Sequence, residues 1–131
     1  MPFAHVMRSG SSDHRSLANL DIIEKEGLLR RARDLETELA DVLKPLEEHA
    51  LVSEVRAGVG VLAAVQIDPA ALEDATLLPR VVPACRRAGI MTRTLATGAI
   101  HVSPPLILDA QGLKELAAGI GAALDELATG A

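Results

Sequence analysis

Arg93 is the residue of this chain whose type and position best suit the binding of a ligand. It lies in a largely apolar run, residues 90–95, that is typical of a β-strand and leads into a turn at Gly98. A guanidinium held by strand backbone presents a planar fork of N–H donors that suits a carboxylate or a phosphate. The same side chain could instead pair with a nearby glutamate or extend along the sheet edge. The position therefore indicates an anionic partner for Arg93 and leaves both interpretations open.

The other reactive side-chain types form no recognisable catalytic or metal-binding motif. The histidines are scattered, at His5, His14, His49 and His101, and none stands in a metal motif with a second ligand-type side chain. His101 falls in a predicted strand, where a packed or edge residue is more common than a base. Cys85 falls on the apolar face of a predicted helix, without a His or Lys beside it to activate the thiol. We expect no metal site and no catalytic residue.

The three lysines are poorly placed for covalent catalysis. Lys25 and Lys44 fall on the exposed faces of predicted helices, and Lys114 falls in the first turn of the last helix. A lysine that forms a Schiff base needs an apolar setting that excludes water. None of the three positions offers such a setting.

Composition limits the class of protein. A chain of 131 residues can bury one core, and with 49% hydrophobic but only 1% aromatic residues this core must consist of aliphatic side chains. The net charge of −5 gives no basic surface for nucleic acid. No apolar run reaches the roughly 18 residues of a membrane span, the first residues lack the apolar core of a signal peptide, and one cysteine excludes an internal disulfide. We expect a cytoplasmic protein without nucleic-acid or membrane partners.

The first half of the chain predicts two helices. Residues 1–16 show no periodicity and are expected to be irregular or disordered, which leaves residues 17–131 as a single domain. Ser16 suits the N-cap of a short helix that ends at Gly27. A longer helix follows, and its apolar stripe consists of Leu28, Ala32, Leu35, Leu39, Val42 and Leu46. This stripe could pack on a sheet or, less in keeping with its short length and with Pro45, form a coiled-coil seam.

The remainder predicts a small sheet and two more helices. Residues 51–56 and 61–67 are typical of a hairpin with glycines at its turn. A helix capped by Asp74 or Thr76 and ended by Gly89 comes next, then strands at 90–95 and 100–102, and a last helix capped by Asp109. The expected fold class is α+β: a small antiparallel sheet of three or four strands covered by about four helices.

Three separated blocks of the sequence resemble one enzyme family. They are L-A-N-L-D-I-I-E-K-E-G-L-L at 17–29, E-V-R-A-G-V-G-V-L-A-A-V at 54–65, and R-x-x-x-x-G-x-x-x-x-S-P-P-L at 93–106 followed by D-x-x-x-L-x-E-L at 109–116. In this order and at this spacing they resemble the C-terminal (small) domain of class III (omega) aminotransferases, enzymes of fold type I that depend on pyridoxal phosphate. The resemblance covers residues 17–131 and implies the fold of that domain.

The resemblance implies a division of roles. Arg93 matches the family position that receives the substrate carboxylate, so substrate binding is the role it implies there. The cofactor it implies is pyridoxal phosphate, but the family's Schiff-base lysine belongs to a large domain that this chain does not match. We therefore expect the isolated chain to supply substrate recognition and domain packing, to bind no pyridoxal phosphate and to lack catalytic competence. Its expected partner is the missing large domain or a second copy in a homodimer.

Two other functions stay open. The chain could be a stand-alone noncatalytic dimerisation or interaction module, or the small-domain subunit of a split transaminase whose large domain is a separate chain. The start of the chain looks truncated relative to the family, which carries F-x-H-G-x-T-Y-S-G-H-P where this sequence keeps only Phe3, His5, Ser9 and Gly10. Because the threonine that reaches the cofactor phosphate is missing, no phosphate-binding role is carried over.

Overall fold

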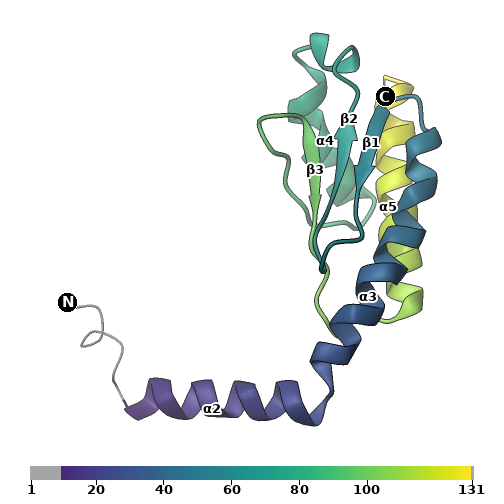
Figure 1. Cartoon of the computed structure of the whole chain (residues 1–131). Helices are drawn as coiled ribbons and strands as arrows, with labels where there is room; N and C mark the ends of the chain where they lie inside the picture. Colours follow the sequence, from purple (N-terminus) through teal and green to yellow (C-terminus); the bar gives the residue numbers. More distant parts are fainter. Residues whose placement is uncertain (1–9, 131) are drawn as a thin grey trace.

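The computed structural model describes residues 10–130, which form a three-stranded sheet, the helices packed on it and one projecting helix (Figure 1). In chain order the elements are α2 (Gly10–Lys25), α3 (Leu28–Leu43), the 3-10 helix η1 (Lys44–Glu48), β1 (Val52–Arg56), β2 (Ala63–Ile67), the 3-10 helix η2 (Ala71–Glu73), α4 (Leu77–Arg87), β3 (Ala99–Val102) and α5 (Ala110–Ala128). The predicted α+β class, with four α-helices and a three-stranded antiparallel sheet among the described residues, is confirmed.

The sheet has the order β1-β2-β3, and both pairs of strands are antiparallel. On the central strand, Val65 lies opposite Val55 on one side and Ile100 on the other. The predicted hairpin between β1 and β2 is confirmed, and Gly58 and Gly60 in its turn have positive φ angles of 92° and 66°. A residue with a Cβ is strained in that region, which explains both glycines.

The core lies between one face of the sheet and helices α3, α4 and α5. Alternation on β2 buries Ala63, Val65 and Ile67, while α3 buries Leu35, Leu39 and Leu43. Helix α3 packs on α5 and β2. The apolar stripe of α3 is therefore used inside the domain, and the structure favours the sheet-packing interpretation over a coiled-coil seam.

Several predicted helix ends are confirmed. The carboxylate of Asp109 caps α5 by accepting a hydrogen bond of 2.8 Å from the backbone N–H of Gly112. Gly27 and Gly89, with φ angles of 61° and 81°, take the left-handed conformation after α2 and α4. Asp74 does not cap α4 directly, because its carboxylate accepts from the N–H and hydroxyl of Thr76 instead.

The prediction for the start of the chain is wrong for residues 10–16. They form the first turns of α2, and residues 1–9 lie outside the described residues. Ser16 is not an N-cap but an interior residue, whose hydroxyl donates to the carbonyl of Ser12 at 2.9 Å. A serine in a helix can satisfy its hydroxyl in this way. Because residues 12–20 are all exposed, no apolar periodicity marks this part of the helix in the sequence.

The prediction of a strand at 90–95 is also wrong. Only Thr94 forms a bridge, to Ile100, although the N–H groups of His101 and Leu95 donate to the carbonyls of Arg93 and Ala99 at 3.0 and 2.8 Å. The hydroxyl of Thr92 donates to the carbonyl of His101. In a regular ladder the N–H of Arg93 would donate to the carbonyl of His101. The Thr92 hydroxyl takes the place of this backbone donor, and the ladder ends there.

Candidate functional site

Arg93 lies on the segment between α4 and β3, and its side chain is exposed. Although it is not in a strand, its backbone is held against β3 by the hydrogen bond from the N–H of His101 to its carbonyl. This bond and the Thr94–Ile100 bridge place Arg93 and His101 directly opposite one another. Opposite residues of an antiparallel pair present their side chains on the same face.

The two side chains border a hollow of about 310 Å³, which is lined by Met91, Thr92, Arg93, His101 and Ser103. No carboxylate lines this hollow. Within residues 10–130, the guanidinium of Arg93 makes no hydrogen bond or ion pair, so the interpretation of Arg93 as the partner of a nearby glutamate is wrong. A solvated cation above a hollow without acidic groups can accept an anion with no internal pair to break.

Other arginines of the described chain are committed to internal partners. Arg31 donates to Glu38 at 2.9 Å and to the carbonyl of Leu108 at 2.6 Å. Arg56 donates to the carboxylate of Glu54 at 2.7 Å. Arg31 thereby ties α3 to the segment before α5, whereas Arg93 makes no such bond within residues 10–130.

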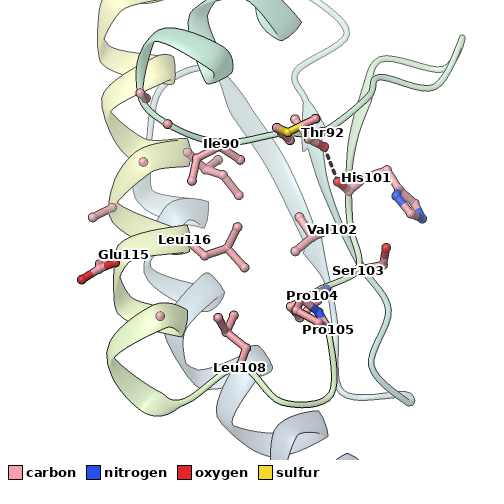
Figure 2. Close-up of a pocket in the computed structure, with 17 residues that line it drawn as sticks. Ile90, Thr92, His101, Val102, Ser103, Pro104, Pro105, Leu108, Glu115 and Leu116 are labelled. Atoms are coloured by element: carbon pink, nitrogen blue, oxygen red, sulfur yellow. Dashed lines mark hydrogen bonds between the residues drawn. The ribbon is translucent and has the colours of Figure 1, made fainter. Parts of the chain in front are cut away.

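A larger groove of about 700 Å³ adjoins the hollow (Figure 2). One of its walls is α5, and the other consists of residues 88–92 and 101–108, which come before and after the start of β3. Its walls are mostly apolar, with Ile90, Leu108 and Leu116 on them and the Glu115 carboxylate directed outward in Figure 2. The groove shares Met91, Thr92, His101 and Ser103 with the hollow. The sequence did not indicate this groove, because it arises from the packing of α5 against residues that are distant along the chain.

The lysines and the cysteine take no part in either concavity. Lys25, Lys44 and Lys114 are all exposed, and none lines the hollow or the groove. Cys85 is fully buried in the core, as predicted, and this burial raises the pKa of its thiol. A raised pKa disfavours the nucleophilic thiolate, which agrees with a packing role for Cys85.

Two further features of the described residues bear on the class of site. None of their helices has the length and apolar character that crossing a membrane requires. Within the same residues, no three His, Cys, Asp or Glu side chains are grouped as metal ligands would be.

The α+β fold matches that of solved transaminases, and comparison with known proteins identifies the family. The family model for class-III aminotransferases matches residues 14–124. This chain belongs to the class III aminotransferase family.

Similar proteins include an uncharacterised aminotransferase, YhxA, of Bacillus subtilis, which is 34% identical over 128 residues, covering 86% of this chain and 28% of the relative. The diaminobutyrate–2-oxoglutarate transaminase of Halomonas elongata is 36% identical over 110 residues, covering 78% of this chain and 23% of the relative. A solved transaminase structure with L-alanine has a TM-score of 0.77 at 31% identity, covering 87% of this chain and 27% of the other. This chain thus spans about a quarter of the length of its relatives, which fits the predicted C-terminal domain.

We predict that Arg93→Ala changes the free energy of unfolding by less than about 1 kcal/mol, because the exposed guanidinium makes no hydrogen bond or ion pair within residues 10–130. The matched control is Arg31→Ala, which removes the hydrogen bonds to Glu38 and Leu108 and should cost about 1 to 2 kcal/mol. Urea unfolding followed by circular dichroism measures both. A loss at Arg93 as large as that at Arg31 would show that Arg93 is a structural residue.

Proposed function

We propose that this chain is the substrate-recognition domain of a class III aminotransferase and that Arg93 binds the carboxylate of the substrate. The observation that carries the proposal is the combination of an exposed arginine, no internal partner within residues 10–130 and a hollow lined without acidic groups. A guanidinium can bind both oxygens of a carboxylate through two parallel hydrogen bonds. Such a contact fixes the orientation of an amino acid or a 2-oxo acid as well as its position.

Pyridoxal phosphate, the cofactor that the family implies, does not fit the lysines of this chain. The cofactor supplies an electron sink for amino-group transfer and is held through a Schiff base to a lysine in a pocket that excludes water. The only lysines of the sequence, Lys25, Lys44 and Lys114, are exposed and lie outside both concavities. We therefore assign the lysine and the cofactor to a larger domain, and to this chain the binding of the substrate carboxylate.

The exposed apolar side chains of helix α2 support the proposal of a larger partner domain. This helix projects from the rest of the domain (Figure 1), and its Leu17, Leu20 and Ile22 side chains are 60%, 61% and 47% exposed. A helix of 16 residues is close to the length below which isolated helices are marginal in water, and large apolar side chains left exposed on it can be covered by another surface. In the proposed enzyme, the larger domain covers these side chains. A split transaminase, with that domain on a separate chain, accounts for the same exposure.

The first prediction from this proposal is that the isolated chain forms no Schiff base with pyridoxal phosphate, because no lysine lies in a suitable pocket. The measurement is the visible absorbance of the chain mixed with the cofactor, followed by borohydride reduction and mass mapping. A stoichiometric, site-specific label on Lys25, Lys44 or Lys114 would contradict the assignment of the cofactor to another domain. Sparse labelling spread over all three lysines is the expected background for exposed amines.

The second prediction concerns activity once a large domain is supplied. Arg93→Gln in a transaminase reconstituted from this chain should lower kcat/KM for amino acids and 2-oxo acids by about tenfold to a hundredfold, the loss of a charged hydrogen bond. Activity toward a simple amine without a carboxylate should be spared. Equal losses on both classes of amino donor would show that Arg93 does not act through the carboxylate. Arg56→Gln, which removes an arginine already paired with Glu54, is the matched control.

The third prediction is that the isolated chain self-associates through α2. Without a larger domain, Leu17 and Leu20 remain uncovered, and a second copy can cover them. Sedimentation at roughly 100 µM should show dimers or larger species, and Leu17→Glu combined with Leu20→Glu should shift them to monomer. Val59→Glu is the control, because Val59 is 85% exposed but lies in the turn between β1 and β2. A monomeric wild-type chain would argue against the proposed role of α2.

A further inference from the structure

His101 lies across from Arg93 on the neighbouring strand, and the register of the sheet fixes the face that it occupies. Ala64 pairs with His101 on one side and with Arg56 on the other. Together with the bond from the N–H of His101 to the carbonyl of Arg93, this pairing forms one cross-strand row: Arg56, Ala64, His101 and Arg93. These four side chains share the face of the sheet that is turned away from the helices. Figure 2 shows the His101 imidazole pointing away from α5.

Within this row, only Arg93 and His101 have polar groups that are free to meet a ligand. Arg56 is engaged with Glu54 at 2.7 Å and with Gln66 at 3.2 Å, and Ala64 has no polar side-chain group. The half-buried imidazole of His101 makes no hydrogen bond or ion pair with any residue of the described range 10–130. In a regular antiparallel ladder, opposite residues that exchange both backbone hydrogen bonds have Cα atoms about 5.5 Å apart, and Arg93 and His101 keep one of these two bonds. That separation allows both side chains to reach one small anion.

The charges around the hollow favour an anion. Its lining residues include no Asp or Glu, and the nearby acid of this sheet face, Glu54, is already neutralised by Arg56. A carboxylate that receives two hydrogen bonds from a guanidinium still has lone pairs left on both oxygens. An imidazole N–H on the adjacent strand can donate to one of them.

We propose that His101 is a second donor to the carboxylate that Arg93 binds, so that the two residues, one on β3 and one on the segment beside it, form one receptor for the carboxylate of an amino acid or a 2-oxo acid. This inference rests on the proposed role of Arg93. His101 is a substrate-binding and specificity residue here, and it takes no part in proton transfer. Its effect is to strengthen the preference for a charged carboxylate over a neutral ester or amide at this position.

The test is a titration of the 131-residue chain with pyruvate at constant ionic strength, with methyl pyruvate as the neutral probe. Carbon–proton correlation spectra follow the imidazole of His101 and, as an internal control, that of His49, which is held by Asp125 at 3.2 Å. Pyruvate should move the His101 signals in a saturable way at a Kd on the order of millimolar. The His49 signals should stay in place, and methyl pyruvate should move neither.

Variants separate this inference from the role of Arg93. His101→Leu should weaken pyruvate binding by about tenfold, the loss of one charged hydrogen bond. His101→Gln keeps an N–H donor and should retain binding within about threefold. Arg93→Gln should weaken binding by more than tenfold. Because His101→Leu changes a half-buried residue, its spectrum should also be compared with that of the wild type to establish that the sheet is intact.

Each outcome decides a different claim. If His101→Leu binds pyruvate as tightly as the wild type while Arg93→Gln does not, the inference is wrong and the role of Arg93 stands. If Arg93→Gln binds as tightly as the wild type, the proposed function of Arg93 fails and the inference fails with it. A wild-type chain that shows no saturable shift up to about 100 mM pyruvate overturns both.

Discussion

The position of β3 between β2 and the segment before it is the constraint on which the candidate site depends. On one side β3 pairs with the central strand, and its Ala99, Ile100 and Val102 are buried in the core. On the other side it receives Arg93 through a single backbone hydrogen bond and the Thr94–Ile100 bridge. The core therefore fixes β3, and β3 in turn fixes the backbone of Arg93 while leaving its guanidinium in solvent. Rigid support beneath an exposed polar group is what a binding residue requires.

Close packing of α5 sets the other wall of the site. An added Cβ at Gly119 would lie 2.5 Å from Cγ1 of Ile90 and 3.2 Å from the carbonyl oxygen of Ala88, so this position of the helix admits a close approach of the segment that leads to Arg93. At Gly121, two residues further on, the nearest atom to an added Cβ is 3.6 Å away, which is ordinary contact. Gly119 therefore marks a level at which the segment after α4 touches α5. The groove of Figure 2 opens beside that contact.

Sequence patterns predicted the elements that depend on neighbouring residues or on a periodic apolar pattern. The apolar stripe of α3, the glycine turn between β1 and β2 and the Asp109 cap each depend on residues near one another in the chain, and all are confirmed. The strand at 90–95 could not be excluded in this way, because a tertiary contact, the bond from the Thr92 hydroxyl to the carbonyl of His101, ends the pairing. Arg93 was identifiable from its residue type and setting. The sequence does not reveal that Arg93 lacks an internal counter-ion or that it shares a face of the sheet with His101. Both depend on the register of the three strands and of the segment beside β3.

The proposed function assigns two requirements of amino-group transfer to different domains. Recognition of a carboxylate needs a cation that stays charged and keeps its donors free. An exposed arginine whose backbone is held beside β3 meets this need. A Schiff-base lysine needs the opposite setting, since loss of its proton is favoured by burial away from water. The two settings are hard to build from one small sheet whose outer face is solvated. In the proposed enzyme this chain would supply the first setting, at Arg93, and the larger domain the second, because all three lysines of this chain are exposed.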